Sequence, residues 1–241
     1  VALSSGKKAL AAGPGNPPVV VDETADIPKA ARDIIRGASF DNDLLCIGEK
    51  EVFVVQEIAD KFMDEMIKNG CYLAKGREIQ AIAGIVLEND KPSKNYIGKD
   101  ASYILEHAGI RASGDVRCVI AETKADHPLV MEELLMPVLP IVRVRNFDEA
   151  LELAVRAEHG YHHTSIIHSK NMDRITRFIK TLRTTVMVIN GCSLASMGMD
   201  AEGIVTLTIA GNTGEGYTTP IHFTQQSRIT LVDSMSIFCR D

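Results

Sequence analysis

The stretch VLPIVRVRNFDEALELAVRAEHGYHHTSIIHSK (residues 138–170) decides the fold class, because it holds one complete strand–helix–strand unit. Val138 to Arg145 predicts a strand, and Phe147 to Glu158 has the apolar spacing of a helix. His163 to His168 predicts a second strand. Two strands joined by a helix in this way lie parallel in one sheet. The unit therefore indicates an α/β fold.

Capping residues mark where these helices begin. Asn146 caps the first helix, and Glu149 three residues later predicts a capping box. Asn171 caps a second predicted helix from Arg174 to Leu182. A last strand is predicted from Thr185 to Asn190, and a tail rich in glycine and poor in helix signals follows it.

The same alternation extends toward the N-terminus. Ala12 to Pro18 must be a loop, because its prolines and glycines interrupt both helix and strand. The further predicted elements are a strand at Val19–Val21, a helix ending near Gly37, a strand at Glu51–Val55, a helix marked by Ile58 to Ile67, helices at Glu78–Leu87 and Ala101–His107, and a strand at Arg117–Ala121. This order predicts a three-layer α/β domain with a mostly parallel sheet.

Composition excludes several classes of function. The net charge is −6, aromatic residues make up 5% and tryptophan is absent, so no nucleic-acid partner is expected. No apolar stretch reaches the roughly 18 to 20 residues of a membrane span. The cysteines are scattered and odd in number, which predicts neither disulfides nor zinc and favours a reducing, intracellular, cytoplasmic setting. They are Cys46, Cys71, Cys118, Cys192 and Cys239.

Cys46 is the best candidate for chemistry. It lies in a turn between a predicted helix and the strand that starts at Glu51. An ionised thiol at such a turn is a competent nucleophile. The alternative is a small buried side chain in the core, which is common for free cysteine. Residues alone leave both readings open.

The histidines cluster at His159, His162 and His163, but no second group of metal-ligating residues has helical spacing, so no metal site is expected. His163 opens a strand and can act as a general acid or base if it reaches the nucleophile. The glycine loops Gly13–Asn16 and Gly211–Gly216 lack the context of a phosphate cradle and predict turns.

Four segments, taken in order, resemble the C-terminal half of a CoA-acylating aldehyde dehydrogenase, in particular the propionaldehyde and acetaldehyde dehydrogenases of bacterial microcompartments. The segments are Gly13 to Asp22, Ala38 to Cys46, Glu132 to Leu139 and His163 to Ser165, and the tail from Gly214 to Asp233 resembles the same subgroup.

The resemblance implies specific roles. Cys46 is the nucleophile that attacks an aldehyde and becomes an acyl thioester, with NAD as hydride acceptor. Glu133 holds a hydroxyl of the nicotinamide ribose, and His163 takes part in catalysis. Ala11 stands where hydrolytic relatives carry a glutamate that activates water. The implied product is therefore acyl-CoA, with coenzyme A as the second substrate, rather than a free acid.

The resemblance also implies an organisation. Residues 1–213 correspond to the catalytic domain and residues 214–241 to a tail with an oligomerisation strand, for which His222 to Val232 has suitable alternation. The family's Rossmann-type cofactor domain precedes the first residue of this chain, so an N-terminally incomplete polypeptide is expected. Homo-oligomers and association with a microcompartment shell are implied as partners.

Two functions remain open from the sequence. One is a thiol-dependent oxidoreductase that makes acyl-CoA from a short-chain aldehyde. The other is a catalytically silent assembly fragment that lacks its cofactor domain.

Overall fold

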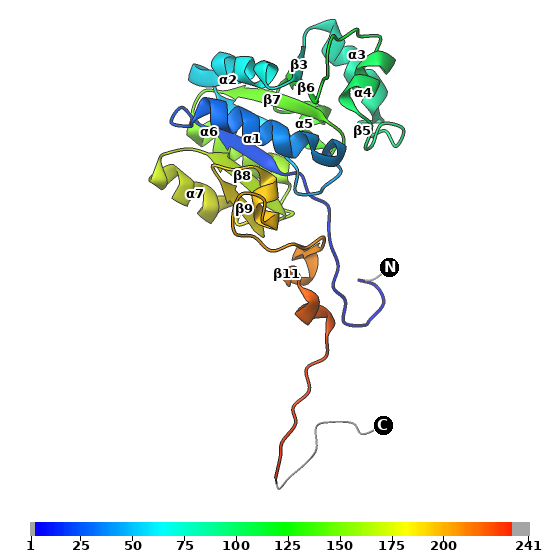
Figure 1. Ribbon diagram of the computed structural model, residues 1–241, viewed down its shortest axis with the longest axis vertical. Coiled ribbons are helices and arrows are strands. Elements are labelled where there is room, and N and C mark those ends of the chain that lie inside the picture. Colours follow the sequence, from blue (N-terminus) through cyan, green and yellow to red (C-terminus); the bar gives the residue numbers. More distant parts are fainter. Residues whose placement is uncertain (1–2, 233–241) are drawn as a thin grey trace.

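A seven-stranded parallel sheet forms the centre of the computed structural model, which describes residues 3–232 (Figure 1). Its strands lie in the order β3-β6-β7-β2-β1-β8-β9, and each neighbouring pair is parallel. Their bounds are β1 Pro18–Val21, β2 Glu51–Val55, β3 Cys71–Ala74, β6 Cys118–Glu122, β7 Val138–Val144, β8 Thr164–His168 and β9 Val186–Ile189. The predicted fold class is confirmed.

Helices cover both faces of the sheet and complete the three layers (Figure 1). α1 and α2 pack on one face, while α6 and α7 pack on the other, with α3 and α4 beside them over β3 and β6. The helices are α1 Ile27–Ser39, α2 Gln56–Lys68, α3 Arg77–Val86, α4 Ala101–His107, α5 Pro128–Met131, α6 Phe147–Glu158 and α7 Met172–Leu182. None of the helices in the described chain has the length and apolar character that a bilayer crossing requires.

The apolar strands are explained by burial on both faces. In β1, Val19 and Val21 contact the layer of α1 and α2, whereas Val20 contacts the layer of α6 and α7. All three are fully buried. A central parallel strand therefore needs a continuous apolar run rather than an alternating one.

β3 and the predicted capping box are among the details that differ from the sequence-based expectations. β3 was not predicted, because four residues between two helices, half of them partly exposed, give little periodicity. Only one of the two hydrogen bonds of the predicted capping box forms. Asn146 accepts a bond from the Glu149 N–H at 3.0 Å, but the Glu149 carboxylate accepts from the Arg145 N–H at 2.7 Å instead of closing back on Asn146.

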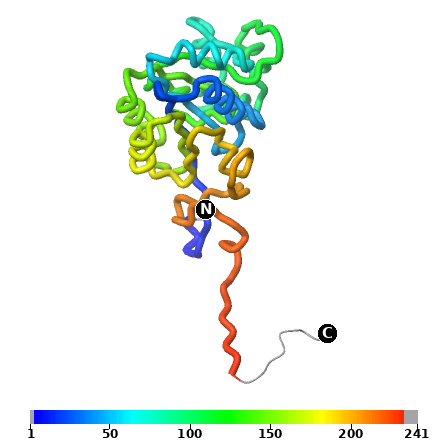
Figure 2. The backbone as a smooth tube through the Cα atoms, turned by 60° about the vertical axis from the view of Figure 1, so that its left-hand side comes forward, coloured from blue at the N-terminus to red at the C-terminus, as the bar shows by residue number. Residues whose placement is uncertain are grey.

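The tail leaves the domain after a small hairpin of β10 (Ile209–Ala210) and β11 (Gly216–Tyr217). Figures 1 and 2 show the N-terminal segment beside this hairpin, and the Ala11 N–H donates to Thr213 Oγ1 at 3.2 Å. The 3₁₀ helix η4 covers Pro220–Phe223, so the edge strand predicted from His222 is wrong at its start, where a proline and a Thr219 cap favour a helical turn. In the described part of the chain, residues 225–232 belong to no sheet.

Candidate active site

The three site residues predicted from the sequence all lie just before a strand. Cys46 precedes β2, Glu133 precedes β7 and His163 precedes β8. Gly15 precedes β1 in the same way. Because β7, β2, β1 and β8 are adjacent in the sheet, the topology brings these four positions to one edge.

This edge is the amino end of the strands. Open α/β sheets usually bind ligands beyond the carboxyl ends of their strands. Here the loops at the opposite edge carry the chemistry-bearing side chains.

Gly15 links Glu133 to His163. Its backbone N–H donates to the Glu133 carboxylate at 3.5 Å. A Cβ at Gly15 would lie 2.9 Å from the His163 imidazole, closer than side chains approach one another. Glycine is therefore required here because both side chains contact the same stretch of backbone.

The Cys46 thiol is half-buried in a turn after the 3₁₀ helix η1, Phe40–Asp43. Burial raises its pKa, and the negative charge of Glu133 raises it further. Lys50 and the backbone N–H of Cys46 act in the opposite direction and favour the thiolate. The state of the thiol thus depends on two charged neighbours of opposite sign.

His163 is buried and neutral at physiological pH. Burial, together with the nearby charge of Lys50, lowers its pKa to about 4. Its Nδ1 lies 2.9 Å from Thr164 Oγ1, and its backbone N–H donates to the Glu158 carboxylate at 2.9 Å. A neutral, fixed imidazole of this kind can accept a proton.

Glu133 is partly buried, and burial raises its pKa, while Lys50 and the Gly15 N–H lower it. Its bond with Gly15 is long, which leaves its carboxylate oxygens with capacity to accept further hydrogen bonds.

Sequence reasoning missed a buried run of charge next to Cys46. Glu49, Lys50 and Glu51 are each at most 1% exposed. Glu49 accepts bonds from the Ser193 N–H at 2.9 Å and from Ser193 Oγ at 2.7 Å. Lys50 forms an ion pair with Asp43 at 3.0 Å. Charged triplets ordinarily lie on the surface, and the one available signal was their position directly before an apolar strand.

Other candidate features fall outside this site. Cys71, Cys118 and Cys192 are buried in the core. Within residues 3–232, no group of three His, Cys, Asp or Glu side chains is arranged to hold a metal.

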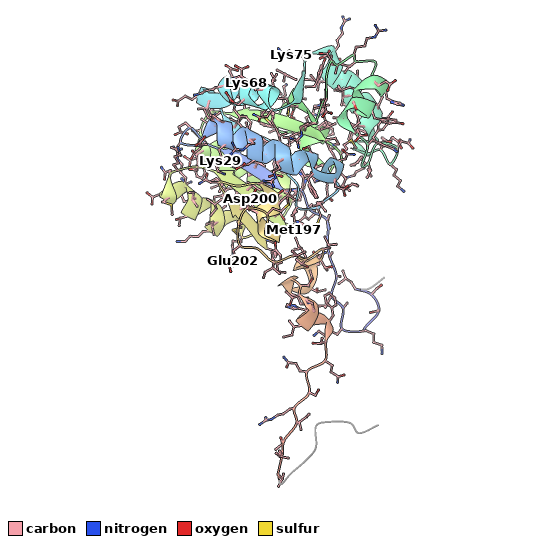
Figure 3. The ribbon with its side chains drawn as sticks, in the orientation of Figure 1. Lys29, Lys68, Lys75, Met197, Asp200 and Glu202 are labelled. Carbon is pink, nitrogen blue, oxygen red and sulfur yellow. The ribbon has the colours of Figure 1, made fainter. Side chains whose placement is uncertain are left out.

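A cavity of about 490 Å³ lies between α1 and the segment after β9 and contains none of the three predicted residues. Figure 3 labels Lys29, Asp200 and Glu202 on its lining. Two ion pairs cross its lining, Lys29 with Asp33 and Arg36 with Asp200.

Comparison with known proteins identifies the family. The model of the aldehyde dehydrogenase family matches residues 1–204. The chain belongs to the aldehyde dehydrogenase family. The resemblance noted in the sequence is thereby confirmed at the level of the family.

Among curated family members, a CoA-propanoylating propanal dehydrogenase of Salmonella typhimurium is 44% identical over 98% of this chain and 51% of its own length. The chain thus spans about half the length of the curated relatives it matches.

Solved structures agree with this assignment. A propionaldehyde dehydrogenase from the fucose utilisation microcompartment of Clostridium phytofermentans has a TM-score of 0.91 and 47% identity, over 98% of this chain and 54% of that one. A propionaldehyde dehydrogenase of Rhodopseudomonas palustris, solved with bound CoA and an acylated cysteine, has a TM-score of 0.90 and 45% identity, over 92% and 51% of the two chains.

Proposed function

We propose that this chain is the catalytic-domain portion of a CoA-acylating aldehyde dehydrogenase that oxidises a short-chain aldehyde, propionaldehyde or acetaldehyde. The observation that carries the proposal is the convergence of Cys46, Glu133 and His163 at one edge of the sheet in a member of this family. The relatives with this activity, and the acylated cysteine of one of them, support it.

In this mechanism the Cys46 thiolate attacks the aldehyde carbon and forms a tetrahedral thiohemiacetal. NAD, when bound, supplies the hydride acceptor. Collapse of the tetrahedral carbon leaves an acyl thioester on Cys46, which is then open to attack by the thiol of coenzyme A. His163 is neutral and can take up a proton from either thiol.

The carboxylate of Glu133 fits a role in holding the nicotinamide ribose. Its oxygens keep acceptor capacity, and ribose hydroxyls are donors. We assign no other residue of this chain to the cofactor.

Ala11 supports acyl transfer to CoA over hydrolysis. Its methyl side chain has no base that could activate water, and its backbone N–H is bound to Thr213 Oγ1. The thioester therefore persists until a thiol arrives.

Replacement of the nucleophile tests the function. Cys46→Ala in the complete enzyme should abolish the acyl-enzyme and lower turnover by several powers of ten. Cys192→Ala, which removes a buried core thiol, is the matched control and should keep its activity. Retained turnover of Cys46→Ala with aldehyde, NAD and CoA would contradict the proposal. The alternative of a catalytically silent assembly fragment would then remain.

We further propose that the complete protein forms homo-oligomers and acts inside a bacterial microcompartment. The support is the run of exposed apolar side chains on the tail, together with the microcompartment source of one relative.

A further inference from the structure

We propose that Lys50 is a positioning residue that holds the loop of the nucleophile Cys46 and supplies a positive charge that favours its thiolate. The inference rests on the proposed role of Cys46 in catalysis. Lys50 is 1% exposed and is the residue directly before β2. Its ammonium contacts the loop that carries Cys46.

Three contacts attach Lys50 to that loop. Its Nζ donates to the Asp43 carbonyl at 2.7 Å and to the Leu45 carbonyl at 3.2 Å. It also forms the ion pair with the Asp43 carboxylate at 3.0 Å. The two carbonyls belong to the residue directly before Cys46 and to the one three positions before it. The ammonium therefore fixes the backbone that presents the thiol.

The loop needs such a support. Asp41, Asn42 and Asp43 have φ of 48°, 52° and 60°, so three successive residues with side chains adopt the left-handed region. That conformation costs about 1 kcal/mol or more per residue and persists where the surroundings determine it. Outside Lys50, the Asn42 side chain donates to the Gly98 carbonyl at 3.0 Å, which holds the other side of the loop.

The charges around the site act through the same ammonium. Asp43, Glu49, Glu51 and Glu133 are carboxyl groups whose ionised forms Lys50 favours. Lys50 also favours the thiolate of Cys46 and the neutral form of His163. The group of Glu133 opposes the thiolate. Loss of the Lys50 charge should therefore leave the thiol facing carboxyl groups without this compensation.

The rate of Cys46 alkylation by iodoacetamide, measured from pH 6 to pH 10 on the 241-residue chain by peptide mass spectrometry, tests the inference. The double variant Lys50→Met/Asp43→Asn removes both partners of the ion pair, so that the Asp43 carboxylate is not left facing the loop without its ammonium. The pH at which Cys46 alkylation reaches half its maximal rate, its pH midpoint, should rise by about one unit in this variant. Alkylation at pH 8 should then be slower by about tenfold. Lys50→Gln/Asp43→Asn keeps a donor without the charge and should show the same shift.

The control is Asp43→Asn alone, which keeps the ammonium and its two carbonyl bonds and should not raise the midpoint. A folded double variant with the same midpoint and rate as this control would overturn the role of Lys50. A wild-type Cys46 that reacts no faster than Cys71, Cys118 and Cys192 would count against the proposed function instead. The comparison between the variants would still decide the role of Lys50.

Discussion

At the residue scale, the buried charges beside Cys46 give the molecule measurable pH behaviour. Glu49 lies under α1 and is bonded to Ser193. Its burial raises its pKa from the usual 4.5 to about 7. Between these two pH values the folded protein holds a proton that the unfolded chain has released. The free energy of unfolding therefore falls as the pH rises through this window.

Glu49→Gln should remove this component, because its amide does not ionise. The free energy of unfolding of the wild type should fall between pH 5 and pH 8, and in the variant this fall should be smaller by up to about 3 kcal/mol. Urea denaturation at the two pH values measures the difference. The exposed Glu57→Gln is the control and should behave as the wild type. An identical pH dependence in Glu49→Gln would show that Glu49 is already ionised in the folded protein.

His168 predicts the opposite pH dependence. It is 2% exposed, and burial lowers its pKa to about 4 from 6.5. The unfolded chain binds a proton first as the pH falls from 6.5 to 4, so the unfolding free energy decreases toward acid. His168→Leu should reduce that decrease by about 3 kcal/mol, with the exposed His107→Leu as control. NMR titration of the His168 imidazole with a midpoint near 6.5 would contradict this.

The sequence located part of the site. Cys46, Glu133 and His163 came from a family resemblance, and the structure places them at one sheet edge. Lys50 was missed because charged side chains in a short turn ordinarily face water, and only the fold shows that this turn is covered. The closeness of Gly15 to His163 depends on the pairing of β1 with β8, which one sequence does not reveal.

At the scale of the elements, prediction was accurate where the apolar pattern of a helix or a buried strand was clear. β2, α4 and α6 have the predicted bounds, and β7 ends one residue earlier than predicted. The pattern failed for β3, which lies at the edge of the sheet and is only partly buried. The period of the apolar residues shows which face of an element is buried, so this signal is weak where the element is only partly buried.

A pair of helix glycines gives a prediction at this scale. In a helix interior, alanine is more favourable than glycine by about 1 kcal/mol. Gly84 in α3 has open space around it, so Gly84→Ala should stabilise the protein by about 0.5 to 1 kcal/mol. A Cβ at Gly37 in α1 would collide with the Glu49 carboxylate, and Gly37→Ala should therefore destabilise it by about 1 to 3 kcal/mol. Thermal or urea unfolding of both variants checks the signs, and stabilisation by Gly37→Ala would contradict the packing.

At the scale of the whole molecule, the tail stands apart from the domain. Figure 2 shows it extending away from the layered body. Ile221, Phe223, Ile229 and Leu231 are each more than half exposed. Such a run of apolar side chains is typical of an interaction surface.

Charges placed on the tail should separate assembly from folding. Ile229→Lys/Leu231→Lys is expected to lower the molar mass measured by light scattering, because the apolar contact is lost. The unfolding free energy should stay within about 0.5 kcal/mol, since neither side chain is packed in the domain. Val205→Lys changes an equally exposed position nearer the domain and serves as control. Unchanged mass in the double variant would remove the tail from the assembly.

The amino-edge position of the site has an electrostatic consequence. Each helix that follows a parallel strand runs back, so its C-terminus returns to this edge. α1 ends at Ser39, ahead of Cys46, and α6 ends at Glu158, ahead of His163. A helix C-terminus carries about half a negative charge. The peptide dipoles of these helices therefore oppose a thiolate at Cys46, whereas a cysteine at a helix N-terminus is favoured by them. Among the described residues, the Lys50 ammonium and the Cys46 backbone N–H favour the thiolate in place of a helix N-terminus.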